Sequence, residues 1–378
     1  MEKLKVLIAT DSFLPRWDGV ARFLNEVLPR IALDFEITVL APEFLGTFKP
    51  YEHINVKRLR LSSRVFGDYT PARFHYREIK KEVSRADVVW THALGPIGAL
   101  AMFEAKRQGK PLIANIHIFE WELVHKSPGF NPLVSAIVYF VVRHFARFMY
   151  NRCDLIFVPS IEVAEILSFE KINANKRIIH LGVDHQKFVP PESKPDAKRL
   201  IGLNPEKVVI GYFGRLGREK DLLTLYRAYM RLRKTHESKV HLLVVGSGVP
   251  AVENIFRNKP GITYVPSQDD IVPYIQAMDI YCLTSLTETT SLSTLEAMSC
   301  EVAVIATPVG AVAEYVKHGK NGLLFSREDK YTLFTSMRQL ADDPALRESL
   351  GSNGRKTVLY RFSWDLTVEE IKEVLKLY

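Results

Sequence analysis

The sequence predicts an α/β protein made of two doubly wound, parallel-sheet domains that face each other across a cleft. Short apolar runs alternate with helical stretches in both halves of the chain, which is typical of parallel sheets covered by helices on both faces. A proline-rich polar stretch at residues 188–195 separates the two series and is typical of a linker. The length of 378 residues is sufficient for two domains with separate cores. We therefore expect one domain at residues 1–188 and a second at residues 189–363.

The apolar runs define the expected strands in chain order. Those of the first domain are residues 6–9, 37–40, 56–61, 88–90, 112–118 and 155–158, and those of the second are residues 208–213, 240–245, 262–265, 280–283 and 302–306. The run that opens the sequence ends at Asp11, too early for a signal peptide, so a first strand explains it better. Cys153, Cys282 and Cys300 have no metal-like spacing, and we expect free thiols in a reducing compartment such as the cytoplasm.

Two carboxylates in the second domain, Glu288 and Glu296, lie eight positions apart. Residues 279–285 are predicted to form a strand and the run after them a helix, so Glu288 follows the carboxyl end of a strand, where open parallel sheets bind ligands. Glu296 lies about one turn into the helix, and the unpaired amides near residues 291–293 form an anion site between the two acids. This arrangement suits a sugar attached to a nucleotide. In the alternative interpretation, residues 293–296 are a capping box and Glu288 is a solvated loop residue.

A second set of residues follows the expected strand at 208–213 and opens an amphipathic helix. The glycines of this segment let the backbone turn sharply, while Arg215 and Lys220 place two cations at the carboxyl end of the strand. An arginine binds phosphate oxygens in bidentate fashion and a lysine supplies a mobile point charge, so the pair suits a diphosphate. The alternative is that both are ordinary surface cations.

With these residues in view, the chain resembles family 4 of the retaining GT-B glycosyltransferases, which transfer a sugar from a nucleoside diphosphate to an acceptor. The resemblance covers nearly the whole chain, and the order and spacing of its parts are more specific than any single part. The matching residues include Asp18-Gly19-Val20, Asn115-Ile116-His117, residues 154–160, Gly182-Val183-Asp184, Gly214-Arg215 with Lys220, Glu288, residues 296–298, and residues 302–310 with Glu314.

The resemblance implies that the second domain binds the donor. Arg215 and Lys220 would hold the diphosphate, Glu296 the ribose and Glu288 the sugar hydroxyls, while His117 of the first domain would face the reacting sugar. The residues that it implies for catalysis are His117, Arg215, Lys220 and Glu288, and those for donor binding are Gly19, Arg215, Lys220, Gly246, Val265, Gln268, Glu288, Ser291, Leu292 and Glu296. It also implies that the last helix, at residues 364–378, crosses back onto the first domain.

Two of these assignments have purely structural alternatives. Gly246-Ser247-Gly248, next to which the base would lie, is also compatible with a plain tight turn. A single histidine at a strand end, such as His117, is often a structural residue with satisfied hydrogen bonds. His92 also follows an expected strand, but no matching motif supports it, and we do not include it in the site.

The implied reaction retains the anomeric configuration, with cations and helix-start amides stabilising the charge on the departing diphosphate. The chain has no Asp-x-Asp pair to hold a divalent ion, so we expect metal independence and no cofactor. Family members commonly follow the first glutamate with glycine, whereas Glu288 is followed by Thr289-Thr290-Ser291, which leaves the donor sugar open. A protein that binds a nucleotide sugar without transferring it, and a nucleotide-sugar epimerase, are the alternatives.

The excess positive charge belongs to the first domain. Residues 1–190 carry 26 basic and 20 acidic side chains, which is +6 of the total of +8. Nine basic residues lie between Lys57 and Arg85, and the helix expected at residues 132–150 is apolar and aromatic, with Arg143 and Arg147 one turn apart. A basic patch beside an aromatic helix suits an anionic membrane, although the uninterrupted apolar part is too short to span a bilayer. For the helix we favour a core position, and for the basic run a membrane contact over a solvated face.

The expected partners are therefore a UDP-, GDP- or ADP-linked sugar, an acceptor glycan or lipid, and an anionic membrane surface. We expect a cytoplasmic protein that binds peripherally at the inner face of the membrane. We expect no nucleic acid partner, because aromatic side chains are not interleaved with the basic patch as base stacking requires.

Overall fold

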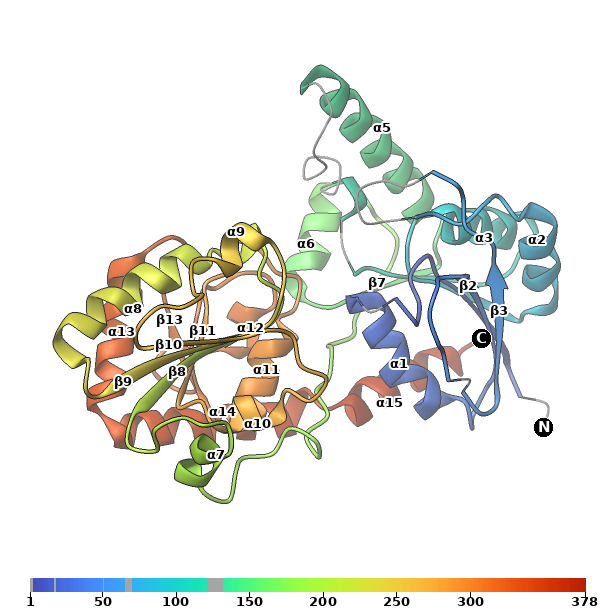
Figure 1. Cartoon of the computed structure of the whole chain (residues 1–378). Helices are drawn as coiled ribbons and strands as arrows, with labels where there is room; N and C mark the ends of the chain where they lie inside the picture. The colour runs from blue at the N-terminus through green and yellow to red at the C-terminus, as the bar shows by residue number, and fades with distance from the viewer. Residues whose placement is uncertain (1–2, 17, 50, 65–69, 118, 122–131) are drawn as a thin grey trace. The chain divides into compact units, whose positions relative to one another are not determined.

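The computed structural model describes residues 3–16, 18–49, 51–64, 70–117, 119–121 and 132–378 (Figure 1). The chain divides into two compact units, one made of Met1–His180 and Trp364–Tyr378 and the other of Leu181–Ser363. Each unit contains one sheet in which all paired strands are parallel. This confirms the predicted α/β class with two parallel-sheet domains.

The sheet of the first unit has the strand order β3-β2-β1-β4-β5-β6-β7. Its strands are β1 (Lys5–Ala9), β2 (Glu36–Pro42), β3 (Ile54–Leu59), β4 (Val88–Thr91), β5 (Leu112–Asn115), β6 (Leu155–Val158) and β7 (Lys176–Ile178). The expected strand at 112–118 ends at Asn115, and residue 118 lies outside the described residues. The order of the strands reverses between β1 and β4, and such a switch point is where doubly wound sheets bind ligands.

Helices cover both faces of this sheet. They are α1 (Gly19–Ile31), α2 (Tyr76–Arg85), α3 (Pro96–Arg107), α5 (Pro132–Tyr150), α6 (Ile161–Phe169) and α15 (Trp364–Leu375). Leu7 of β1 lies in one core cluster with Ile79 of α2 and Ile97 of α3. On the opposite face, Phe23 of α1 packs edge-on against Trp90 of β4 and Trp364 of α15.

The last helix is thus part of the first unit, although the chain passes through the second unit before reaching it. Besides the Phe23–Trp364 contact, Lys372 Nζ lies 2.9 Å from Asp34 Oδ2. Thr367 Oγ1 donates a hydrogen bond to the carbonyl oxygen of His180 at 2.8 Å. These contacts hold α15 to α1 and to the end of the unit's first segment.

The sheet of the second unit has the strand order β10-β9-β8-β11-β12-β13. Its strands are β8 (Val208–Phe213), β9 (Val240–Val245), β10 (Ile262–Val265), β11 (Ile280–Leu283), β12 (Ala303–Ala306) and β13 (Leu323–Leu324). Its helices are α7 (Lys194–Leu200), the 3-10 turn η1 (Arg218–Lys220), α8 (Leu222–His236), α9 (Pro250–Glu253), α10 (Val272–Gln276), α11 (Leu292–Ser299), α12 (Val312–Tyr315), α13 (Lys330–Asp342) and α14 (Pro344–Arg361). Strands β8 to β11 have the bounds that the sequence predicts, because each is a short apolar run closed by turn residues.

The boundary between the units lies after His180, and not after residue 188 as the sequence indicates. Val183 donates its amide to the carbonyl oxygen of Phe362 at 2.7 Å, and both Val183 and Phe188 are buried in a core of the second unit. Lys194, in the proline-rich stretch, donates to the carbonyl oxygens of Gln276 and Met278 at 3.1 and 2.6 Å. The stretch that looked like a linker therefore packs onto the second unit.

The expectation that residues 132–150 form a core helix is wrong. Helix α5 has these bounds, but only Ala146, Met149 and Tyr150, near its C-terminal end, are buried. Most of its large apolar side chains are exposed to solvent. The apolar composition of a helix does not show whether the rest of the fold covers it. Here the described neighbouring residues leave most of the helix uncovered.

Candidate active site

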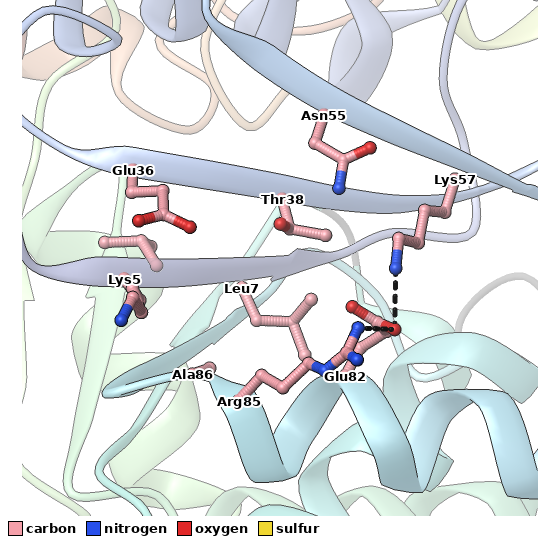
Figure 2. A pocket seen from close by; sticks show the side chains of 10 residues that line it. Lys5, Leu7, Glu36, Thr38, Asn55, Lys57, Glu82, Arg85 and Ala86 are labelled. Atoms are coloured by element: carbon pink, nitrogen blue, oxygen red, sulfur yellow. Dashed lines mark hydrogen bonds and ion pairs between the residues drawn. The ribbon is translucent and has the colours of Figure 1, made fainter.

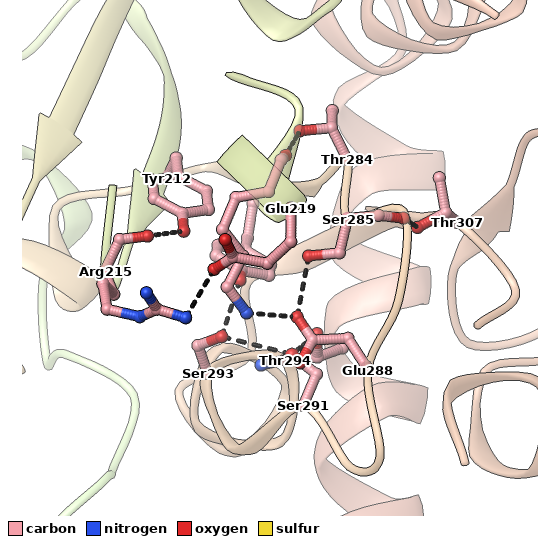
Figure 3. Close-up of polar contacts among 12 residues, drawn as sticks. Tyr212, Arg215, Glu219, Thr284, Ser285, Glu288, Ser291, Ser293, Thr294 and Thr307 are labelled. Carbon is pink, nitrogen blue, oxygen red and sulfur yellow. Dashed lines mark hydrogen bonds and ion pairs between the residues drawn. The ribbon is translucent and has the colours of Figure 1, made fainter. Parts of the chain in front are cut away.

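The second unit brings Lys220 and Glu288 together at the carboxyl edge of its sheet. Lys220 Nζ lies 2.6 Å from Glu288 Oε1, and the side chains are 18% and 12% exposed. Ser285 Oγ donates to the same carboxylate oxygen at 2.7 Å, and Figure 3 shows the Ser285 hydroxyl directed toward the Glu288 carboxylate. Lys220 ends η1 after β8, and Glu288 follows β11, the neighbouring strand. Glu288 is therefore a fixed, largely buried carboxylate and not a solvated loop residue.

Arg215 follows β8 as well, but its side chain is 69% exposed and its guanidinium pairs with Glu219. The distance from Arg215 Nη2 to Glu219 Oε1 is 2.7 Å, and the Tyr212 hydroxyl donates to the carbonyl oxygen of Arg215 at 2.8 Å (Figure 3). Glu219 was not predicted as a site residue. The signal that could have identified it is its spacing of four from Arg215, because oppositely charged residues at this spacing commonly form ion pairs within one turn.

Helix α11 begins at Leu292, with Ser291 as its N-cap. Ser291 Oγ accepts from the backbone amide of Thr294, while Ser293 Oγ instead lies 2.8 Å from the hydroxyl of Tyr281. The capping-box interpretation of residues 293–296 is therefore wrong, because the helix starts two residues before the position that it requires. Glu296 lies inside the helix and is 3% exposed.

A turn after β12 holds the loop of Glu288 in place. Gly310 has a φ of +54°, and a Cβ there would lie 2.2 Å from the carbonyl oxygen of Glu288. The amide of Ala311 donates to the carbonyl oxygen of Thr289 at 3.0 Å. Only a residue without a side chain allows this approach, so Gly310 helps to fix the path of the loop.

Three neighbouring loops of the second unit form the region that the resemblance assigns to the nucleotide. Gly246 follows β9 and donates its amide to the carbonyl oxygen of Val265, at the end of β10, at 2.9 Å. The amide of Leu216 donates to the carbonyl oxygen of Ser247 at 3.0 Å, which joins the loop after β8 to the loop after β9. Gln268 is exposed beyond these loops. Gly246-Ser247-Gly248 is thus a tight turn that also packs against the loop of Arg215.

The remaining predicted residues, Gly19 and His117, lie in the first unit. Gly19 is the first residue of α1, and a Cβ there would meet no atom of the described residues within 4 Å. Asp18 caps this helix by accepting from the amides of Val20 and Ala21, both at 3.0 Å. As far as the described residues show, the space beside the Gly19 backbone is open at a capped helix start.

His117 belongs to a pair of histidines. Its Nε2 lies 3.0 Å from Nδ1 of His92 and 3.2 Å from Nδ2 of Asn115, and the two imidazole rings are stacked with centroids 5.3 Å apart. Burial lowers the pKa of His117 to about 4 and that of His92 well below its usual value, so both rings are neutral near pH 7. Among the described residues, both hydrogen-bond contacts of the His117 ring involve Nε2.

His92, which we did not include in the predicted site, lies against His117 in the structure. The two residues follow β4 and β5, which are neighbours in the sheet. Both rings also lie near Phe23 of α1, at centroid distances of 5.7 and 5.2 Å. The pairing of β4 with β5 was the missing signal, because it brings the two strand ends together.

Two further acids of the first unit lie close to the carboxyl edge of its sheet. Asp11, just after β1, accepts from the amides of Ile97 and Gly98 at 3.0 Å each, and burial nevertheless raises its pKa to about 6. Glu120 accepts from the hydroxyl of Tyr150 at 2.6 Å, and burial raises its pKa to about 7. Neither acid was predicted as a site residue, because burial of a carboxyl group after a strand has no sequence signal.

Glu120→Gln should remove a pH dependence of folding stability. The folded-state pKa of about 7 is above the ordinary value of 4.5, so protonation favours the folded state. This stability is fully present below about pH 4.5 and is lost as the pH rises through 7, by up to about 3 kcal/mol. Urea unfolding at pH 5 and pH 8 should show a smaller loss of unfolding free energy for Glu120→Gln than for the wild type.

The control is Glu165→Gln, at an exposed position of α6 in the same unit. Equal pH dependence of the wild type and Glu120→Gln would contradict the assignment.

None of these residues lines the surface groove of about 490 Å³ at the amino ends of β1, β2 and β3 (Figure 2). Its buried carboxylate, Glu82, is paired with Lys57 at 2.7 Å and with Arg85 at 3.4 Å. Ligands of doubly wound sheets bind at the carboxyl ends, so we do not assign the site to this groove. The two cations at the ends of the basic run at 57–85 are thus directed at an internal acid, which weakens the membrane interpretation of that run.

Comparison with known proteins agrees with this geometry. The sequence profile described as glycosyl transferases group 1 matches residues 207–343, and that of glycosyltransferase family 4 matches residues 17–187. An uncharacterised glycosyltransferase of Methanocaldococcus jannaschii is 24% identical over 100% of this chain and 99% of its own. A GDP-mannose-dependent α-(1-6)-phosphatidylinositol monomannoside mannosyltransferase of Mycolicibacterium smegmatis is 24% identical over 98% of each chain.

Solved structures share the fold over the whole chain. HepE of Anabaena in complex with UDP superposes with a TM-score of 0.77 at 17% identity, covering 99% of this chain and 100% of that one. A sucrose-phosphate synthase of Thermosynechococcus elongatus gives 0.77 at 18% identity, covering 100% and 99%. Two parallel-sheet units of this kind define the GT-B class of glycosyltransferases. The chain belongs to the group 1 glycosyltransferases, with the N-terminal region characteristic of family 4.

Proposed function

We propose that this glycosyltransferase is a retaining, metal-independent enzyme that moves a hexose from a nucleoside diphosphate to a hydroxyl of a lipid or glycolipid. The observation that carries the proposal is the Lys220–Glu288 ion pair beside the start of α11. It places a cation suited to a leaving diphosphate next to a carboxylate suited to sugar hydroxyls. The amides at the start of α11 supply further positive potential close by.

The charge on the leaving group determines which residues matter most. As the bond to the anomeric carbon breaks, negative charge grows on the diphosphate, and preorganised cations stabilise it. Lys220 is held in place by Glu288, whereas Arg215 has to exchange its contact with Glu219 for a phosphate oxygen. Two such cations can neutralise the diphosphate charge that a divalent ion would otherwise neutralise. The chain also has no Asp-x-Asp pair, and both points support metal independence. The roles that the resemblance gives to Gly19 and His117 remain part of this proposal.

The names of related proteins support the donor and acceptor classes. HepE has been solved with UDP-glucose, and the mycobacterial relative acts with GDP-mannose on a phosphatidylinositol mannoside. An α-monoglucosyldiacylglycerol synthase of Streptococcus pneumoniae is 23% identical over 80% of this chain. For this chain we propose a nucleotide-sugar donor and a lipid-linked acceptor, used by a cytoplasmic protein at the inner face of the membrane.

A nucleotide-sugar screen tests the proposal. One UDP-, GDP- or ADP-linked hexose should raise the melting temperature of the protein, because a ligand that binds only the folded state stabilises it. With a diacylglycerol or glycolipid in detergent, that donor should then release nucleoside diphosphate in the presence of EDTA and yield a product of unchanged anomeric configuration by proton NMR.

The other outcomes identify the alternatives. Binding without release of nucleoside diphosphate would mark a binding protein, and conversion of the donor into a different nucleotide sugar would mark an epimerase. Loss of release with EDTA would overturn metal independence. An inverted product would overturn retention.

A further inference from the structure

Helix α5 presents a broad apolar face to solvent. Figure 1 shows the helix extending away from the rest of its unit. Its exposed large apolar side chains are Leu133, Val134, Ile137, Phe140, Val141, Phe145 and Phe148, and their exposed fractions run from 43% to 70%. Residues three, four and seven positions apart lie on the same side of a helix, so these side chains form one continuous surface, here called the α5 face. Contiguous apolar surfaces of this kind mark interaction sites.

The other side of α5 anchors it to the unit. Ala146, Met149 and Tyr150 are buried in the core, and Tyr139 and Val142 pack against that core. Arg143 forms an ion pair with Glu170 at the end of α6. The α5 face is therefore attached to a folded body through the opposite side of the same helix.

This attachment determines how α5 could meet a bilayer. The segment Leu133–Tyr150 is, among the described residues, the one helix whose length and mean hydropathy of 1.3 would allow it to cross a membrane. Crossing would require Tyr139, Ala146 and Met149 to leave the core and would place Arg143 and Arg147 in hydrocarbon. A helix that keeps one side on its own domain instead lies in the plane of the interface, with the other side in the headgroup and acyl region.

The charges of α5 favour an anionic partner. The helix contains no acidic residue, and of its two arginines Arg143 is paired with Glu170, so Arg147 supplies its net positive charge. Arg152, just beyond the helix, stacks on the ring of Phe148, 3.4 Å from its centroid, and so lies beside the α5 face. Cations at the border of an apolar surface add affinity for anionic lipid, about tenfold or less for each residue. A second copy of the chain would bring these like charges together, which disfavours self-association through this face.

We propose that the α5 face is the surface by which this protein docks on an anionic lipid bilayer, with α5 lying parallel to the membrane plane. This docking rests on the proposed function in one respect, since its role is to bring the enzyme to a lipid acceptor. The binding itself needs neither donor nor acceptor. It assigns membrane attachment to α5 rather than to the basic run at 57–85, whose end cations contact Glu82.

Co-flotation of the full chain with vesicles tests the docking surface. The wild type should float with vesicles of phosphatidylcholine and phosphatidylglycerol at low salt, and less with phosphatidylcholine alone or at high salt. Leu133→Glu combined with Phe140→Glu should reduce the bound fraction at least tenfold. The matched control combines Leu200→Glu and Tyr360→Glu in the second unit, where the wild-type side chains are 73% and 80% exposed, and it should float like the wild type. Circular dichroism of each variant checks that the fold is intact.

Three outcomes would overturn the inference. The first is that the wild type fails to float with anionic vesicles at low salt. The second is that the α5 variant floats as well as the control. The third is that the wild type is a dimer in solution, the α5 variant is a monomer, and neither binds vesicles. Release of nucleoside diphosphate with a detergent-solubilised acceptor is measured separately. A protein that floats but transfers no sugar contradicts the proposed function only, and one that transfers sugar but does not float contradicts the docking surface only.

Discussion

Lys220→Met should lower the rate of sugar transfer by roughly a hundredfold, because removal of one preorganised group at a developing charge costs about 3 kcal/mol of transition-state stabilisation. Lys220 Nζ is held 2.6 Å from Glu288 and is only 18% exposed, so its position is determined before a ligand binds. Release of nucleoside diphosphate from the donor that the screen identifies is the measurement. The loss should appear in kcat as well as in kcat/KM, since the charge develops mainly in the transition state.

The control is Arg218→Met in the same 3-10 turn. Arg218 is an exposed cation two residues from Lys220, so its removal changes the net charge of the turn equally. It should leave transfer within about threefold of the wild type if position, and not total charge, determines the effect. Loss of Lys220 also leaves the carboxylate of Glu288 unpaired, which destabilises a largely buried acid. The double variant Lys220→Met/Glu288→Gln removes that carboxylate charge, and it should recover stability without recovering activity. Transfer by Lys220→Met at a rate close to that of the wild type would contradict the proposed role.

Gly246→Ala should destabilise the second unit by about 3 kcal/mol or more and weaken nucleotide binding. Gly246 has a φ of +144°, and a Cβ there would lie 1.9 Å from the carbonyl oxygen of Gly214 and 2.9 Å from a methyl carbon of Leu216. The loop after β8 therefore has to move, and it carries Arg215. Urea unfolding and the thermal shift produced by the donor measure the two effects.

Gly319→Ala is the matched control for this prediction. Gly319 also has a positive φ, +74°, but a Cβ there would meet no atom within 4 Å in the part of the chain that the structure describes. Its substitution should cost about 1 kcal/mol for the conformation alone, which is the ordinary penalty for alanine in this region. Equal effects of the two substitutions would mean that the loop after β8 moves without a cost in folding free energy. The close packing of the loops after β8 and β9 would then contribute nothing to stability.

Much of the fold and part of the candidate site follow from the local sequence pattern. The strands β8, β9, β10 and β11 have the predicted bounds because short apolar runs ended by turn residues specify them without long-range information. Lys220 and Glu288 were named from the rule that ligands bind at the carboxyl ends of parallel strands, and their 2.6 Å contact agrees with it. The partner of Arg215 was not foreseen, because the direction of an exposed side chain depends on neighbours that a linear pattern does not show.

The sequence by itself determined the class of fold, the family resemblance and the carboxyl-edge position of the candidate donor residues, since all of these depend on periodicity and spacing along the chain. Only the tertiary structure decided that His92 lies against His117, because that contact requires β4 and β5 to be neighbours. It also decided that the first unit ends at His180, where Val183 begins to pack with Phe362. The exposure of α5 was decided in the same way, since burial depends on which surfaces the folded chain brings together, and the hydropathy of a segment does not contain that information.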